Sequence, residues 1–265
     1  MDDFQFKKSL GQNFLTDRNI IHNIVDKANI DKNTLVIEIG PGGGALTKEI
    51  VPLCKKAILY EADSRLENNL RDLLKEYDNY SLIIGDFLKV NLRKDLNNVS
   101  YDKLYVVANL PYYITTPIIM KFIEENVLPL KIVVMVQKEV ALRLAAKVGS
   151  KDYGSLTVLL NYYYDINKLF DVSRNCFVPK PNVDSAVIAL DLKEDRLELK
   201  NIDLFKKLVR DSFTLKRKTL KNNLKGYDLK KIENVLINYG FDLSVRAEQL
   251  SLEIFVEIAN SLSNL

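Results

Sequence analysis

Two stretches of the sequence place ligand-binding residue types directly after apolar runs. Residues 36–45 read Val-Ile-Glu-Ile-Gly-Pro-Gly-Gly-Gly-Ala, and Gly40, Gly42 and Ala45 satisfy the G-x-G-x-x-G/A spacing of nucleotide-binding turns. Glycines let the backbone approach a bound molecule, and the first N–H groups of the following helix lack intrahelical partners. A second apolar run, 56–60, ends on Glu61, at the distance expected for a carboxylate that holds ribose hydroxyls. The two matches together predict a nucleotide site.

Two further apolar runs also end in polar residues. Asp86 follows the run 80–84, and Asn109 follows the run 104–108. An Asp86 carboxylate could accept a hydrogen bond from the amino group of an adenine. The carboxyl ends of parallel strands meet at one edge of a sheet, where open α/β sheets bind ligands. The sequence therefore predicts an adenosine-containing cofactor in a single crevice.

The tetrapeptide Asn109-Leu110-Pro111-Tyr112 indicates a reaction at a nucleobase amine. Such an amine is a poor nucleophile because its lone pair is delocalised into the ring. The Asn109 carbonyl and a nearby backbone carbonyl, each accepting one amine N–H, would favour a pyramidal amine whose lone pair is free to attack. Pro111 would fix the turn, and Tyr112 would offer a face on which an extruded base can stack. No titrating acid or base is required, which suits a chain whose single histidine is His22.

These groups must be positioned by a sheet with helices between its strands. We expect strands at residues 36–39, 56–60, 80–86, 104–108 and 131–136. Two more strands are expected at 155–164 and 185–192 with no helix between them, so at least one is antiparallel to its neighbour. The predicted fold class is α/β, a doubly wound, mostly parallel sheet with one antiparallel strand. After residue 193 only helical spacing remains, which predicts a domain over 1–193 and a small all-α domain over 194–265.

Composition restricts the class of protein. The 265 residues are 47% hydrophobic and 28% charged, which is typical of a globular protein. No apolar run approaches the ~20 residues of a spanning helix, and the first residues lack a signal-peptide pattern. We therefore expect a cytoplasmic protein with no membrane partner. Cys54 and Cys176 lie far apart without C-x-x-C spacing, so we predict no metal site.

The net charge of +3 is unevenly distributed. Residues 212–227 contain no acidic residue and these basic ones: Lys216, Arg217, Lys218, Lys221 and Lys225. The run is a candidate phosphate-binding surface, and the alternative is a solvated helix surface.

Several motifs, read together, resemble the ribosomal RNA adenine-N6 dimethyltransferases. They are Gln12-Asn13-Phe14-Leu15, Glu38-Ile39-Gly40-Pro41-Gly42-Gly43-Gly44, Glu61, Gly85-Asp86, residues 109–115 (Asn-Leu-Pro-Tyr-Tyr-Ile-Thr), residues 177–185 (Phe-Val-Pro-Lys-Pro-Asn-Val-Asp-Ser) and Arg217-Lys218-Thr219-Leu220. The resemblance runs from about Lys7 to Leu224. It is closest to the bacterial members that dimethylate two adjacent adenosines in a hairpin loop near the 3′ end of small-subunit (16S) RNA.

The resemblance implies a Rossmann-like class I methyltransferase fold with S-adenosylmethionine as methyl donor and no metal. Its catalytic motif would be Asn109, Leu110, Pro111 and Tyr112, with Asn109 between the donor and the target. The donor would be bound by Asn13 and Leu15 at its methionine end, Gly40 and Gly42 by backbone approach, Glu61 at the ribose and Asp86 at the adenine amine.

The resemblance also implies how RNA is bound. Tyr112 and Phe177 would sandwich the target adenine, and the RNA phosphates would be held by Lys7, Lys8, Lys216, Arg217, Lys218, Lys221 and Lys225. The implied partners are 16S RNA and the 30S subunit or its assembly intermediate, with a role in small-subunit biogenesis. We expect the protein to act as a monomer.

Three other functions are compatible with parts of the sequence. An antibiotic-resistance methyltransferase acting on large-subunit RNA shares most motifs, although Leu110 and the Arg217-Lys218-Thr219-Leu220 signature resemble the small-subunit enzyme more. A nicotinamide-dependent dehydrogenase would explain the glycine spacing and Glu61 but not Asn109-Leu110-Pro111-Tyr112. A non-catalytic RNA-binding factor for ribosome assembly would leave the intact catalytic motif unexplained.

Overall fold

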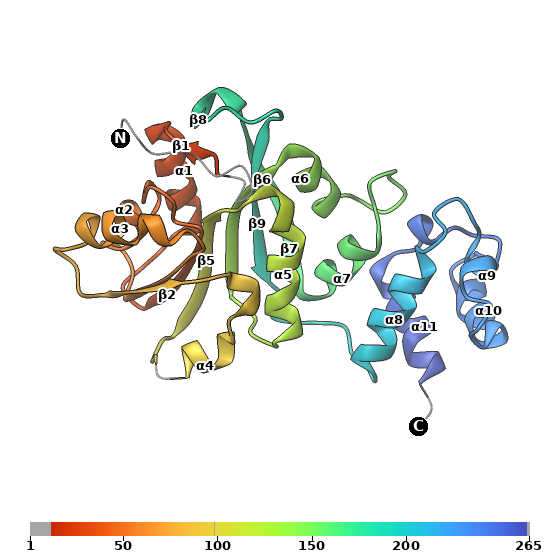
Figure 1. Ribbon diagram of the computed structural model, residues 1–265. Helices are drawn as coiled ribbons and strands as arrows, with labels where there is room; N and C mark the ends of the chain where they lie inside the picture. The colour runs from red at the N-terminus through yellow and green to blue at the C-terminus, as the bar shows by residue number, and fades with distance from the viewer. Residues whose placement is uncertain (1–11, 98, 264–265) are drawn as a thin grey trace. The chain divides into compact units, whose positions relative to one another are not determined.

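The computed structural model describes residues 12–97 and 99–263 of the chain, and Figure 1 shows its helices and strands. It divides into two compact units. The first contains the chain up to Ala141 together with Asn167–Leu192, and the second contains Leu142–Ile166 together with Lys193–Leu265.

The first unit is built on a seven-stranded sheet with the order β4-β3-β2-β5-β6-β9-β7. The strands are β2 (Thr34–Ile39), β3 (Lys56–Glu61), β4 (Tyr80–Ile84), β5 (Lys103–Asn109), β6 (Lys131–Gln137), β7 (Tyr164–Val172) and β9 (Ser185–Leu192). Strands β2 to β6 pair in parallel, whereas β9 is antiparallel to β6. The prediction of an α/β fold with a mostly parallel sheet and an antiparallel strand is confirmed.

The prediction of a strand at residues 155–164 is wrong. Residues Ser155–Tyr163 form helix α7, and strand β7 follows immediately. Most of α7 is apolar and buried, so its sequence shows no clear face from which a helical period can be read. Strand β7 was missed because it lies at the end of the sheet, where charged residues such as Asp165 and Lys168 are tolerated.

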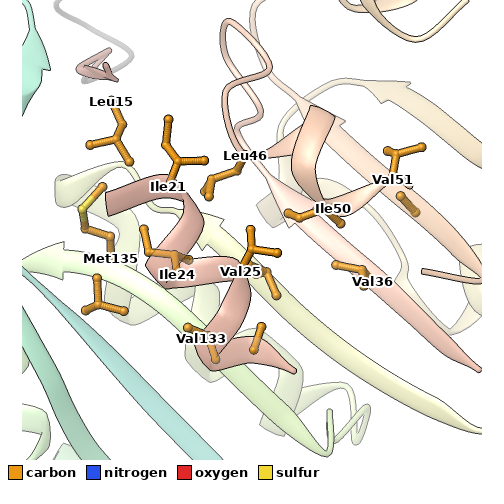
Figure 2. Close-up of a cluster of buried hydrophobic side chains, with 14 of the residues drawn as sticks. Leu15, Ile21, Ile24, Val25, Val36, Leu46, Ile50, Val51, Val133 and Met135 are labelled. Carbon is orange, nitrogen blue, oxygen red and sulfur yellow. The ribbon is translucent and has the colours of Figure 1, made fainter. Parts of the chain in front are cut away.

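Helices cover both faces of this sheet. On one face, helix α1 (Arg18–Ala28) buries Ile21, Ile24 and Val25 against strand residues that include Val133 and Met135 of β6 (Figure 2). On the other face, the ring of Tyr60 contacts Phe87, and Phe87 contacts Phe122 of helix α5 (Thr115–Glu124). The sheet is thus fixed from both sides, which holds the ends of its strands in place.

Short elements complete the first unit. A two-stranded sheet pairs β1 (Phe14–Leu15) with β8 (Phe177–Val178) in antiparallel register, with Leu15 opposite Phe177. The remaining helices are α2 (Thr47–Ile50), η2 (Ser64–Leu66), α3 (Glu67–Leu73), η3 (Phe87–Lys89), α4 (Leu92–Leu96), η4 (Tyr112–Ile114), α6 (Lys138–Leu144) and η5 (Arg174–Cys176).

The second unit is helical around its own apolar cluster. Its helices are α7, α8 (Ile202–Ser212), α9 (Leu220–Asn223), α10 (Leu229–Asn238), η6 (Ala247–Gln249) and α11 (Leu252–Leu262). Phe205 of α8 and Phe255 of α11 are fully buried in the cluster, together with Leu208 and Ile232. No helix in the described part of the chain is both long and apolar enough to cross a membrane.

Candidate active site

A cavity of about 610 Å³ lies at the carboxyl ends of the parallel strands in the first unit. Its lining includes Gly40 after β2, Glu61 at the end of β3, Asp86 after β4 and Asn109 at the end of β5. Asn13, Leu15 and Gly42 also line it, as do Leu110, Pro111 and Tyr112. The residues that the sequence assigned to one crevice are therefore brought together, apart from Phe177. A cavity of this size is sufficient for a cofactor-sized ligand.

Backbone hydrogen bonds connect the ends of neighbouring strands around the cavity. The N–H of Gly40 donates to the carbonyl of Tyr60 at 2.8 Å, and the N–H of Gly85 donates to the carbonyl of Glu61 at 2.8 Å. Gly42 adopts a positive φ of 59°, and a Cβ at this position would lie 2.6 Å from a ring carbon of Phe14. Only glycine allows the β2–α2 turn and the Phe14 ring to approach each other so closely.

The carboxylate of Glu61 is fixed by backbone donors. Its Oε2 accepts from the N–H of Gly42 at 2.9 Å, and its Oε1 accepts from the N–H of Asp63 at 2.8 Å. Each carboxylate oxygen has two lone-pair sites, so both oxygens can accept a further hydrogen bond from a ligand hydroxyl. Burial raises the pKa of Glu61, whereas the two backbone donors lower it. The side chain is thus oriented before any ligand arrives.

Asp86 lies in a more polar setting than Glu61. Its Oδ1 accepts from the N–H of Leu88 at 2.9 Å and caps helix η3, while its side chain remains 45% exposed. Lys89 lies 3.9 Å away, and a pair as exposed as this one contributes little to stability. The exposed carboxylate can accept a hydrogen bond from a ligand amine at the rim of the cavity.

The side chain of Asn109 has a defined orientation. Its Nδ2 donates to the backbone carbonyl of Asn13 at 3.1 Å, so the amide nitrogen is directed toward the segment that begins β1. The N–H of the next residue, Leu110, donates to the carbonyl of Met135 at 3.1 Å and continues the pairing of β5 with β6. With its nitrogen assigned to Asn13, Asn109 presents Oδ1 as an acceptor.

Tyr112 begins helix η4 beside Asn109. Its hydroxyl lies 2.6 Å from Oγ of Ser185, at the start of β9, and burial raises the pKa of Tyr112. The carbonyl of Pro111 accepts from the N–H of Ile114 at 3.2 Å and from the Thr115 hydroxyl at 3.3 Å, which closes the turn. The contact of its hydroxyl with Ser185 and the closed backbone turn therefore both hold the Tyr112 ring at the wall of the cavity.

Phe177 is placed differently from the other predicted site residues. It is 2% exposed, belongs to the apolar cluster of Leu15 and Val172, and does not line the cavity. Its neighbour Val178 lines the cavity and is 52% exposed. The stacking role of Phe177 stays a prediction, and it requires the ring to leave this cluster.

The predicted RNA-binding residues divide into two groups. Lys7 and Lys8 lie outside the described residues. The other five are all exposed in the second unit, where Lys216, Arg217 and Lys218 form the turn after α8, Lys221 lies in α9 and Lys225 follows α9. The run is therefore a turn with a short helix rather than one face of a long helix. Their binding of RNA stays a prediction.

Comparison with known proteins identifies the family. A family model described as ribosomal RNA adenine dimethylase matches residues 3–264. The chain belongs to the ribosomal RNA adenine dimethylase family. It is 49% identical to a protein of Bacillus licheniformis named ribosomal RNA small subunit methyltransferase A, over 98% of this chain and 92% of that one. This membership rules out the dehydrogenase alternative and makes the protein an enzyme of methyl transfer.

Solved structures agree with the adenine dimethylase family. The chain is similar to a dimethyladenosine transferase from Plasmodium falciparum, with a TM-score of 0.77 and 30% identity over 92% of this chain and 95% of that one. It is also similar to the 23S rRNA methyltransferase ErmE, with a TM-score of 0.75 and 26% identity over 94% of this chain and 99% of that one. The predicted class I methyltransferase fold is confirmed.

The adenine dimethylase site contains a second buried carboxyl group that the sequence analysis did not single out. Glu38 in β2 lines the cavity at 1% exposure, and within the described residues its Oε2 has no hydrogen-bond partner. Burial, with a smaller contribution from the nearby charge of Glu61, raises the pKa of Glu38 to about 8. The group is therefore mostly protonated near neutral pH, and a positively charged ligand in the cavity would favour its charged form. The position of Glu38 two residues before Gly40, in the predicted ligand-binding turn, is the sequence feature that could have identified it.

Metal chemistry has no ligand set in the part of the dimethylase chain that the structure describes. No group of three or more His, Cys, Asp and Glu side chains there could hold a metal ion. Cys54 is buried and Cys176 is half-buried, and both are free thiols.

Proposed function

We propose that this protein transfers methyl groups from S-adenosylmethionine to the N6 amines of two adjacent adenosines in small-subunit ribosomal RNA. We further propose that it acts as a monomer on the 30S subunit or its assembly intermediate. One observation carries the proposal. Gly40, Glu61, Asp86 and Asn109, from four neighbouring strand ends, line the same cavity, so a cofactor bound by the first three would lie beside Asn109.

The residues of the cavity fit the proposed cofactor. S-adenosylmethionine supplies an electrophilic methyl group on a positively charged sulfur. Glu61 would accept from the ribose hydroxyls and Asp86 from the adenine amine. Asn13 and Leu15 would line the methionine end, while Gly40 and Gly42 allow close backbone approach. The positively charged sulfur would also favour the charged form of Glu38, whose Oε2 has no hydrogen-bond partner within the described residues.

The protein would promote the reaction by positioning the target amine against the methyl donor. Asn109 would accept one N–H of the target amine through Oδ1. The Pro111 carbonyl is engaged by Ile114 and Thr115. We therefore assign the second acceptor to the carbonyl of Leu110. With both N–H groups held, the amine lone pair attacks the methyl carbon, the C–S bond breaks as the N–C bond forms, and a proton leaves to solvent. The site contributes orientation and water exclusion rather than a titrating base.

The target adenine would stack on Tyr112, whose ring is fixed by the Ser185 hydroxyl. Base stacking on an aromatic side chain contributes about 1 to 3 kcal/mol. Phosphates of the RNA would bind the exposed basic residues of the second unit, and Lys7 and Lys8 would also bind phosphates. The predicted division into a catalytic part, 1–193, and an RNA-binding part, 194–265, would then be modified, because Leu142–Ile166 belongs to the second unit.

The deciding experiment is incubation of purified 30S and 50S subunits with the protein and labelled S-adenosylmethionine, followed by mass spectrometry of the RNA. We expect two adjacent N6,N6-dimethyladenosines near the 3′ end of 16S RNA and no modification of 50S subunits. Methylation of the large subunit alone would favour the function of the ErmE-like relatives. Absence of any methylation would refute the proposal.

A further inference from the structure

Asp63 is a buried carboxylate next to the site that lies outside the cavity lining. It is 1% exposed and follows Glu61 by two residues at the end of β3. Its Oδ1 accepts from Nε of Arg65 at 2.9 Å, and its Oδ2 accepts from Nη2 of Arg65 at 2.6 Å. The Arg65 guanidinium holds the pKa of Asp63 well below its usual range, so the side chain carries a full negative charge.

Asp63 reaches two other parts of the site. Its backbone N–H donates to Oε1 of Glu61 at 2.8 Å, and its Oδ2 accepts from Nε2 of Gln12 at 2.9 Å. Gln12 lies 51 residues before Asp63 in the sequence. A single residue therefore connects the expected ribose carboxylate to the segment that precedes β1.

The segment that begins with Gln12 also contacts the catalytic motif. The carbonyl of Asn13 accepts from Nδ2 of Asn109 at 3.1 Å, which sets the orientation of that amide. Two consecutive residues, Gln12 and Asn13, thus contact the end of β3 and the end of β5. The bond between Gln12 and Asp63 therefore fixes the residue that directly precedes the Asn13 carbonyl.

A capping role alone does not account for this arrangement. Asp63 caps the three-residue helix η2 through a bond of 3.3 Å from the N–H of Arg65. Asp17 caps the longer helix α1 through backbone N–H donors, accepts in addition from the Cys176 thiol, and remains half-buried without a guanidinium partner among the described residues. A cap needs no guanidinium partner, whereas a carboxylate buried as deeply as Asp63 needs one to stay charged, because burial alone would raise its pKa.

We infer that Asp63 is a positioning residue for methyl transfer, which acts through Gln12 to hold the Asn13 carbonyl where it orients Asn109. The inference rests on the proposed function, because it concerns the rate at which the amine is methylated. It predicts that disturbing either residue slows the chemical step more than it weakens cofactor binding.

The test is a double-mutant cycle of Gln12→Ala and Asp63→Asn, with Arg71→Gln as control. Arg71 forms an exposed pair with Glu67 on α3, at 2.8 Å, that touches no site residue described above. Three quantities are measured for each variant: the single-turnover methylation rate on 30S subunits at saturating S-adenosylmethionine, the Kd of S-adenosylhomocysteine by calorimetry, and the Tm.

We expect each single variant to lose about tenfold in rate, with a change in Kd of less than about threefold. The double variant should be no slower than the slower single variant, because both changes break one connection. Arg71→Gln should retain the rate of the unsubstituted protein. Additive losses in the double variant, a normal rate in Gln12→Ala, or a loss of rate that follows Tm alone would overturn the inference. No methylation by the unsubstituted protein would instead refute the proposed function.

Discussion

The hydroxyl of Tyr112 lies 2.6 Å from the Oγ of Ser185, and this contact joins the turn that begins helix η4 to the first residue of β9. Ser185 is fully buried, so the contact is shielded from water. The distance between the two oxygens is typical of an O–H···O hydrogen bond. The antiparallel strand therefore stabilises the orientation of a ring on the opposite side of β6.

This contact predicts a graded response to substitution. Tyr112→Phe keeps the ring but loses the hydrogen bond, so methylation should fall by about tenfold or less. Tyr112→Ala also removes the stacking face, and its loss of kcat/KM should be larger by about 1 to 3 kcal/mol. Ser185→Ala serves as the matched control and should resemble Tyr112→Phe in single-turnover assays. An unaltered rate in Tyr112→Ala would remove the ring from the target site.

Asn109→Ala should abolish methyl transfer because the amine then loses its side-chain acceptor. Removal of a positioned hydrogen-bonding group of this kind typically costs about 100-fold or more in kcat. The Kd of S-adenosylhomocysteine, measured by calorimetry, should remain within about tenfold of that of the unsubstituted protein, since Glu61 keeps its backbone donors. Full activity in this variant would contradict the assigned role.

Gly42→Ala should weaken cofactor binding through backbone strain and a steric clash. The new Cβ would lie 2.6 Å from the Phe14 ring, on a residue with φ of 59°, and the N–H of Gly42 also donates to Glu61. We expect calorimetry to give a Kd for S-adenosylhomocysteine raised by about tenfold or more. Gly226→Ala is a suitable control, because a Cβ there meets nothing within 4 Å. Equal affinities in the two variants would contradict this interpretation.

RNA affinity should fall steeply with salt if the basic run binds phosphates. About five contacts at ~0.7 each predict a log–log slope of about −3 to −4. Replacing Lys218 and Lys221 by Gln should reduce the slope by about 1.4, which filter binding at several salt concentrations can measure. Lys230 and Lys231 of α10 are also exposed, and the same change there should leave the slope unaltered. A flat salt response would exclude the run from the RNA-binding surface.

Stability should depend on pH through Glu38. Its pKa is raised from 4.5 to about 8 by burial, so the folded state holds a proton that the unfolded state releases between these values. The contribution of Glu38 to the free energy of unfolding should therefore be fully present below pH 4.5 and fall as pH rises toward 8, by at most about 1.4 kcal/mol per unit. Glu38→Gln should flatten this dependence in denaturant titrations. Glu49→Gln, at an exposed position of α2, should leave it intact, and equal slopes in all three proteins would contradict the assignment.

The sequence predicted the positions of those elements whose pattern of apolar residues is compatible with only one type of secondary structure. Strands β2 to β6 are continuous apolar runs ending in glycine or polar residues, so their places and the shared crevice could be predicted. Helix α7 could not, because apolar residues surround nearly its whole circumference. The contacts of Gln12 with Asp63 and of Asn13 with Asn109 span 51 and 96 residues. Such long-range pairs follow from tertiary packing and leave no local pattern.

The same reasoning explains the result for Phe177. A motif can predict a site role for a phenylalanine, but the direction of its ring depends on the register of β8 with β1. Here that register directs Phe177 into the cluster around Leu15.

The pairing of β1 with β8 also has a consequence for biosynthesis. The hydroxyl of Thr16, at the end of β1, donates to the carbonyl of Cys176, which is added to the growing chain 160 residues later. A nascent chain that has exposed the glycine turn and Asn109 still lacks the strand that anchors its amino-terminal segment. The pairing of β1 with β8 can therefore form only after most of the first unit has been synthesised.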